Sequence, residues 1–180
     1  MKKKRRFWKI FGIVTAVLMI TAIAGSIGYV SHIKNSENYV QFDKGRLNEV
    51  YTSLTVLDNE GAPLSEPLYL NNYKQIPLDA LHDYTYMAFV AVEDKRFFDH
   101  NGIDYKRVAG ALVHNLKSGS YKEGASTISQ QLIKNTHLDN YKTLRRKVNE
   151  MLLASELERA YSKKEILEMY VNTIYFGRNA

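Results

Sequence analysis

The sequence predicts a mainly α-helical protein with a transmembrane helix near its N-terminus and a small β-hairpin before the main domain. Residues 10–30 are an uncharged apolar run, only residues 49–70 alternate as strands do, and apolar residues recur at helical spacing from Pro77 onward. Because strands and helices do not alternate along the chain, a doubly wound parallel sheet is not expected. The 180 residues suffice for an anchor and one medium domain.

Residues 10–30 are long and apolar enough to cross a bilayer as a helix. Seven basic residues and no acidic one precede residue 35, so the formal charge of +6 leaves only −1 for residues 35–180. By the positive-inside rule, residues 1–9 form a cytoplasmic basic tail and the chain after the anchor lies outside, in the extracellular or periplasmic space. With its positive charge beside the anchor, the chain is not expected to bind nucleic acid.

A cleaved signal peptide is the alternative for this segment. Ala22-Ile23-Ala24 has the small-x-small form that a signal peptidase recognises. The apolar run continues beyond it to Val30, which favours an uncleaved, single-pass anchor in the cell membrane. Cysteine is absent, so an exported domain of this kind must be stable without disulfides.

After the anchor, residues 31–48 are polar and without periodicity, as in a juxtamembrane stalk, and the main domain is expected over residues 49–180. A hairpin is predicted from the alternation in residues 49–57, the turn signal in residues 58–61 and the extended run in residues 67–70. Five helices should follow. Their predicted start signals are, in order, Asp79, Asp104, Thr127, Thr143 and the capping box of Ser162 and Glu165, and Gly177 is expected to end the last one.

Two adjacent carboxylates, Glu93 and Asp94, end the first of these helices beside Phe97 and Phe98. A carboxylate at the rim of an apolar core is suited to act as a general base. The alternative is a helix that simply becomes polar as it leaves the core. His100, which follows, is expected to hold a turn rather than to act as a base.

Residues 124–135 form a second candidate region. On a helix, Ser126, Gln130 and Lys134 share one row, and Thr127 and Gln131 form the neighbouring row. A helix N-terminus behind a glycine-containing loop has free N–H groups that favour an anion such as diphosphate. The alternative is a solvated helix face with an ordinary Thr cap.

Two further segments carry charge. Arg146 and Lys147 precede Glu150 by one helical turn, a spacing that suits either surface ion pairs or cations that hold a phosphate. Residues 162–172 are expected to serve capping and packing before chemistry. No zinc-binding or nucleotide-binding motif occurs, so no cofactor is predicted, although a divalent cation such as Mg²⁺ or Mn²⁺ stays open.

Taken in order, four motifs resemble those of the peptidoglycan glycosyltransferase family, the glycan-polymerising domain of class A penicillin-binding proteins and monofunctional transglycosylases. The motifs are Glu93-Asp94-x-x-Phe97-x-x-His100-x-Gly102, Gly124-x-Ser126-Thr127-Ile128-x-Gln130-Gln131, Arg146-Lys147-x-x-Glu150 and Lys164-Glu165-Ile166-Leu167-Glu168-x-Tyr170-x-Asn172.

The resemblance implies a lysozyme-like helical domain that polymerises lipid II into peptidoglycan strands at the outer face of a bacterial membrane. It implies inverting transfer with release of undecaprenyl diphosphate, and lipid II, the growing glycan and other cell-wall synthesis proteins as partners. By the same resemblance, Glu93 is the catalytic base and Glu150 assists at the donor. The substrate-binding positions that carry over are Asp94, Phe97, His100, Ser126, Thr127, Gln130, Gln131, Lys134, Arg146 and Lys147.

The resemblance also implies that the domain is C-terminally incomplete here, because the family continues with further helices. Two other functions stay open. One is a catalytically inactive, membrane-anchored module that binds lipid II or the cell-wall machinery, and the other is a lysozyme-like hydrolase, which needs an acid to protonate the leaving oxygen.

Overall fold

The computed structural model describes residues 2–37, 39–49, 53–54, 56–64, 68–69, 75–119, 124–139 and 141–174. The chain divides into two compact units, residues 1–39 and residues 40–180. The predicted end of the last helix at Gly177 lies outside the described residues.

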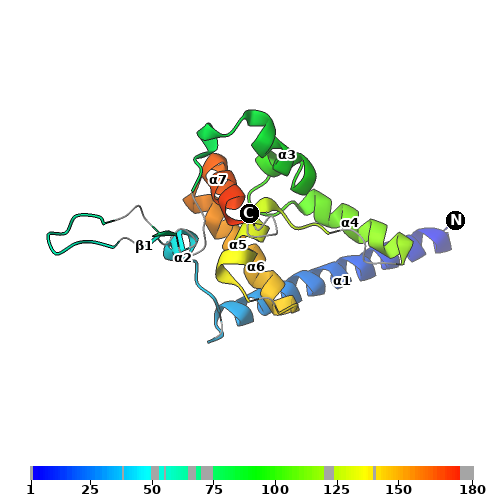
Figure 1. Cartoon of the computed structure of the whole chain (residues 1–180). Helices are drawn as coiled ribbons and strands as arrows, with labels where there is room; N and C mark the ends of the chain where they lie inside the picture. The colour runs from blue at the N-terminus through cyan, green and yellow to red at the C-terminus, as the bar shows by residue number, and fades with distance from the viewer. Residues whose placement is uncertain are drawn as a thin grey trace. The chain divides into compact units, whose positions relative to one another are not determined.

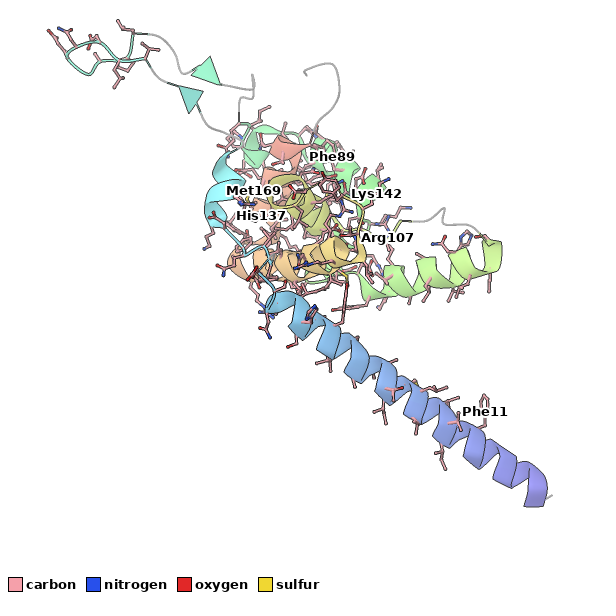
Figure 2. All side chains as sticks on the ribbon, turned by 90° about the horizontal axis from the view of Figure 1, so that it is seen from below. Phe11, Phe89, Arg107, His137, Lys142 and Met169 are labelled. Atoms are coloured by element: carbon pink, nitrogen blue, oxygen red, sulfur yellow. The ribbon has the colours of Figure 1, made fainter. Side chains whose placement is uncertain are left out.

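The first unit contains one long helix, α1 (Lys2–Lys34). Its apolar side chains between Phe11 and Ile27, such as Leu18 and Ile20, are exposed around the helix, and Figure 2 shows Phe11 standing out from it. Within the described residues, Phe11–Lys34 is the stretch long and apolar enough to cross a membrane. An exposed apolar surface of this extent is the property that a lipid environment stabilises.

The second unit is a cluster of helices with one short β-ladder (Figure 1). In chain order its elements are α2 (Lys44–Glu49), β1 (Ser53–Leu54), β2 (Leu68–Tyr69), the 3₁₀ turn η1 (Leu78–Ala80), α3 (Asp83–Glu93), the 3₁₀ turn η2 (Phe97–Asp99), α4 (Tyr105–Ser118), α5 (Ile128–His137), α6 (Leu144–Ala160) and α7 (Lys163–Thr173). The mainly helical class predicted from the sequence is confirmed. The strands β1 and β2 pair antiparallel, with Ser53 opposite Tyr69, in the segment where the hairpin is expected.

The core lies where α5, α6 and α7 pack side by side (Figure 1). Its fully buried side chains include Leu132 and Ile133 of α5, Leu153 and Leu157 of α6, and Ile166 of α7. Each helix carries a buried pair spaced four residues apart and so turns an apolar stripe to its neighbours; the pairs are Ile128 and Leu132, Leu153 and Leu157, and Ile166 and Tyr170. Packing of these stripes fixes the three helices that carry most of the predicted motifs.

Three apolar residues between positions 40 and 47 pack on this core, within the stretch where a solvated stalk is expected. Leu47 on α2 is buried, and Val40 and Phe42 pack against the same cluster. The Phe42 ring also stacks on His137 at the end of α5, with ring centroids 5.5 Å apart. The folded unit therefore begins ahead of residue 49, because three apolar residues in this otherwise polar stretch are enough to dock it.

Four of the five predicted helix starts are confirmed. Asp104, Thr127, Thr143 and Ser162 are N-caps, each accepting a hydrogen bond from a backbone N–H in the first turn of its helix. The prediction for Asp79 is wrong. Asp79 lies in η1, which follows Pro77, and α3 begins one turn later with His82 as its N-cap.

Candidate active site

Helix α5 connects the four motifs that the sequence analysis singled out. Three hydrogen bonds join its N-terminal half to the segment from Glu93 to Gly102. Ile128 N donates to Asp94 Oδ2 at 3.1 Å, the Thr127 hydroxyl donates to the Gly102 carbonyl at 2.6 Å, and Gln131 Nε2 donates to Glu93 Oε2 at 2.9 Å. The first two motifs therefore form one structural unit.

Glu93 is the last residue of α3 and is half-buried. Its side chain lies at the polar end of a helix whose Val90 is in the core, as the sequence predicts. The bond from Gln131 fixes one carboxylate oxygen, so the other is the oxygen that can take a proton from an incoming hydroxyl.

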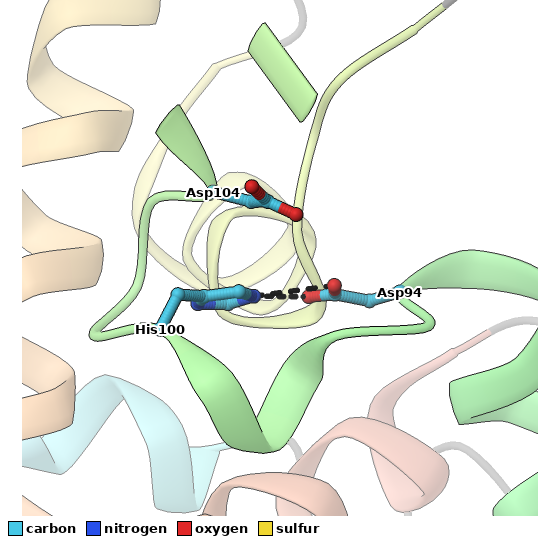
Figure 3. Close-up of side chains that lie close together, drawn as sticks. All are labelled: Asp94, His100 and Asp104. Atoms are coloured by element: carbon cyan, nitrogen blue, oxygen red, sulfur yellow. Dashed lines mark hydrogen bonds and ion pairs between the residues drawn. The ribbon is translucent and has the colours of Figure 1, made fainter. Parts of the chain in front are cut away.

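The buried Asp94 and the partly buried His100 form a pair (Figure 3). His100 donates from Nε2 to Asp94 Oδ2 at 3.0 Å, because a carboxylate can only accept. Asp94 is completely buried and also receives the Ile128 N–H at the start of α5, where a negative charge is stabilised by the helix dipole. His100 therefore holds a turn, as expected, and Asp94 anchors α5.

This arrangement changes the expectation that free N–H groups at the start of α5 bind an anion. Asp94 takes the N–H of Ile128, and the Thr127 side chain takes that of Gln130. Gln130 completes a capping box by accepting from Thr127 N at 3.1 Å. Thr127 and Gln130 are also buried, and their side chains serve the helix start.

Phe97 likewise lies inside the protein. Its ring belongs to the core cluster and meets Phe98 edge to face, with centroids 5.1 Å apart. The Lys163 ammonium lies over the Phe97 ring, 4.3 Å from its centroid, which ties η2 to the start of α7. The aromatic residue of the first motif thus supports the turn that follows Glu93.

A second polar cluster joins α6 to Ser126, the residue before the N-cap Thr127. Lys147 Nζ donates to Ser126 Oγ at 2.8 Å and forms an ion pair with Glu150 Oε1. Glu150 is buried while the Lys147 side chain is partly exposed, so the ammonium is oriented from inside the protein. Arg146, on the neighbouring position, has a buried Nε with no partner among the described residues.

Glu93 and Glu150 reach α5 at different points. Glu93 contacts Gln131, and Glu150 acts through Lys147 on Ser126, just ahead of the helix. Lys134 lies on α5 three residues beyond Gln131 and is half-buried. The two acids are therefore both connected to residues 126–131. Of the three predicted cations, Lys134 lies on α5, and Arg146 and Lys147 lie on α6.

A pocket of about 540 Å³ lies between the end of α3 and the start of α4. It is lined by Val92, Lys95, Arg96, Asp104 and Arg107, so neither Glu93 nor Glu150 lines it. Arg96 and Asp104 form an ion pair within the lining. Burial alone would raise the pKa of Asp104, but the bonds from Arg96 and from Arg107 N outweigh it and hold this pKa below its usual value.

Asp94, His100 and Asp104 are the one group of three possible metal ligands found among the described residues, with donor atoms within 4.8 Å of one another (Figure 3). These donors already have partners. Asp94 serves Ile128 and His100, and Asp104 receives both the Arg96 guanidinium and Arg107 N. Because a guanidinium already neutralises Asp104, the group does not fit a divalent cation.

Tyr170 lies in a segment expected to serve capping and packing, yet it contacts a residue of the candidate site. Its hydroxyl, on α7, donates to Gln131 Oε1 at 3.1 Å. Burial and the negative charge of Glu93 raise the pKa of Tyr170 to about 12. The signal was present in the fourth motif, but nothing in the spacing of residues 162–172 indicates that this hydroxyl reaches α5.

Comparison with known proteins identifies relatives of this chain. The sequence profile of a family described as Transglycosylase matches residues 60–180. The chain is 41% identical over 179 residues to penicillin-binding protein 1A/1B of Bacillus subtilis (strain 168), covering 99% of this chain and 19% of that protein. It is 40% identical over 176 residues to penicillin-binding protein 1F of the same organism, covering 98% and 23%.

A shorter match, 53% identical over 93 residues, is found with penicillin-binding protein 1A of Neisseria gonorrhoeae and covers 52% of this chain and 12% of that protein. The chain spans about a fifth of the length of the two Bacillus relatives.

Proposed function

This chain belongs to the transglycosylase family, and we propose on that basis that it is a membrane-anchored peptidoglycan glycosyltransferase that polymerises lipid II. The observation that carries the proposal is the partly exposed Glu93 carboxylate, held through one oxygen by Gln131 at the end of α3. A base fixed in this way suits the activation of a sugar hydroxyl.

In the proposed reaction, Glu93 takes the proton from the 4-hydroxyl of the acceptor sugar through Oε1. The hydroxyl oxygen then forms a bond to the anomeric carbon of the donor, and the bond between that carbon and the diphosphate oxygen breaks with inversion. Undecaprenyl diphosphate leaves with the electron pair. A diphosphate needs neutralising charge more than a proton donor, and Lys134, Arg146 and Lys147 are the cations we assign to it.

Glu150 has a supporting role in this proposal. It is buried and ion-paired to Lys147, whose ammonium also donates to Ser126. The pairing keeps the ammonium in place while leaving part of its side chain exposed, so Glu150 assists at the donor by orienting a cation.

We further propose that residues 10–30 anchor the protein in the bacterial membrane, with the basic residues 1–9 in the cytoplasm and the second unit outside. The apolar surface of α1 and the six basic residues among residues 2–9 support this orientation. An anchored enzyme and a lipid-linked substrate share one surface, which raises their encounter rate. Other proteins of cell-wall synthesis are expected as partners.

The test is polymerisation of lipid II by the detergent-solubilised chain and by Glu93→Gln. The substitution preserves shape and removes the base, so we expect the rate to fall by roughly 10²–10⁴-fold. Asp99→Asn is the matched control, because Asp99 is an exposed carboxylate nearby, and it should leave the rate unchanged.

Equal rates for wild type and Glu93→Gln would remove the catalytic role of Glu93. Binding of lipid II without turnover by wild type would instead support an inactive binding module. Release of new reducing ends from purified cell wall would support a hydrolase.

A further inference from the structure

Tyr170 on α7, Gln131 on α5 and Glu93 at the end of α3 form a continuous hydrogen-bonded chain. The Tyr170 hydroxyl donates to Gln131 Oε1 at 3.1 Å, and Gln131 Nε2 donates to Glu93 Oε2 at 2.9 Å. We propose that Tyr170 is a positioning residue that orients the Glu93 carboxylate through the Gln131 amide. The inference rests on the proposed function, because it assigns a role in the same reaction.

The direction of the hydrogen bonds gives this chain one consistent arrangement. A glutamine amide has a donor end and an acceptor end, and the two can exchange by rotation of the amide. Glu93 accepts only, so the NH₂ must face it. The carbonyl must then face Tyr170, where a hydroxyl donates. Rotating the amide would bring its carbonyl oxygen against the carboxylate and leave two acceptors facing each other.

The Tyr170 hydroxyl is a dependable donor at neutral pH. Burial raises the pKa of Tyr170 to about 12, and the negative charge of Glu93 acts in the same direction. The hydroxyl therefore keeps its proton throughout the range in which a glycosyltransferase would work. A lysine or histidine at this place would change charge more readily and would not fix the amide in the same way.

The position of this hydroxyl is fixed by the fold. Only 2% of Tyr170 is exposed, and its ring meets Phe89 of α3 edge to face at 6.4 Å. The same helix is held at two further points, where Glu168 accepts from Leu78 N at 2.8 Å and Asn172 accepts from Ile76 N at 2.8 Å. Because Tyr170 is buried, it acts on Glu93 through Gln131 and does not contact substrate.

The first test observes the amide directly. In the full chain labelled with ¹⁵N, the side-chain NH₂ signals of Gln131 are assigned by their loss in Gln131→Glu. In wild type we expect the chemical shifts of the Gln131 NH₂ group to differ from those of the exposed Gln41. In Tyr170→Phe we expect the Gln131 chemical shifts to move toward the Gln41 values. Tyr86→Phe is the matched control, because it removes a tyrosine hydroxyl that donates to Asp83 on the same helix as Glu93.

The second test separates positioning from binding in the lipid II assay. Tyr170→Phe should lower kcat by roughly three- to tenfold with KM little changed, which corresponds to the loss of one hydrogen bond. Gln131→Glu keeps an acceptor for Tyr170, loses the donor to Glu93 and adds a like charge beside it, so kcat should fall at least as far. The double variant should be no worse than Gln131→Glu, because both changes break one chain.

Unchanged Gln131 signals in Tyr170→Phe, or fully multiplicative losses in the double variant, would overturn the proposal. If Tyr170→Phe fails to fold, Gln131→Glu decides through the KM and kcat values, since a loss confined to KM would also overturn it. If wild type does not polymerise lipid II, the proposed function fails by itself. The NMR signals still decide whether Tyr170 orients the amide.

Discussion

Replacing Gly102 by alanine will destabilise the second unit because the new methyl group has no space. Gly102 has φ = 85°, a left-handed conformation that costs a residue with a side chain about 1–2 kcal/mol. Its Cβ would also lie 2.8 Å from the Ala154 carbonyl oxygen and 2.9 Å from the carbonyl carbon of the same residue, in the backbone of α6. A backbone cannot move aside as a flexible side chain can, so this overpacking adds about 1–3 kcal/mol.

The expected loss in the free energy of unfolding is therefore about 2–5 kcal/mol. Thermal unfolding of the full chain in detergent, followed by circular dichroism, should show the midpoint fall by on the order of 10 °C. Gly119→Ala is the control, because Gly119 has φ = 61° but nothing within 4 Å of its Cβ position. It should lose only about 1–2 kcal/mol.

Hydrogen exchange gives a local measure of the same clash. The Gly102 carbonyl accepts the Thr127 hydroxyl, so a displaced loop should speed exchange in the first turn of α5 in Gly102→Ala and not in Gly119→Ala. Equal destabilisation by the two substitutions would refute the reasoning, since it would show that the contact with α6 carries no cost.

Two further predictions concern the same region. Thr127→Ala removes the N-cap of α5 and the bond to Gly102, so it should lower the free energy of unfolding by about 1–3 kcal/mol, while Thr127→Ser should restore most of it. Asp104 has a lowered pKa in the folded state, so its charge stabilises the fold above the ordinary value of 3.8 and this contribution is lost as pH falls through the lower folded value. The difference in unfolding free energy between wild type and Asp104→Asn should therefore be largest near neutral pH and shrink in acid; a difference that does not change with pH would contradict this.

Features that depend on neighbouring residues were predictable from the sequence. The caps Asp104, Thr127, Thr143 and Ser162 are recognisable because a short polar side chain bonds to an N–H two or three residues away. Asp79 shows the limit of this reasoning. It has the same chemistry, but the 3₁₀ turn after Pro77 delays α3 until His82, which accepts from Tyr84 N.

Features that depend on distant residues were not predictable. The sequence places Glu93 at a helix end, yet it cannot show that Asp94 occupies an N–H of α5 that an anion was expected to use. It also cannot show that Tyr170, expected to pack, reaches Gln131 from another helix. Both contacts join residues more than 30 positions apart, and only the packing of the helices brings them together.

The dependence of Glu93 on α7 has a consequence for folding during synthesis of the chain. Glu93 is made early, but the helix whose Tyr170 reaches it through Gln131, and whose Glu168 binds the segment ahead of α3, is made last among the described elements. In a nascent chain from which α7 has not yet emerged, the Glu93 carboxylate therefore lacks the orientation that Tyr170 gives it through Gln131. The proposed catalytic base therefore gains this hydrogen-bonded support only after α7 has docked.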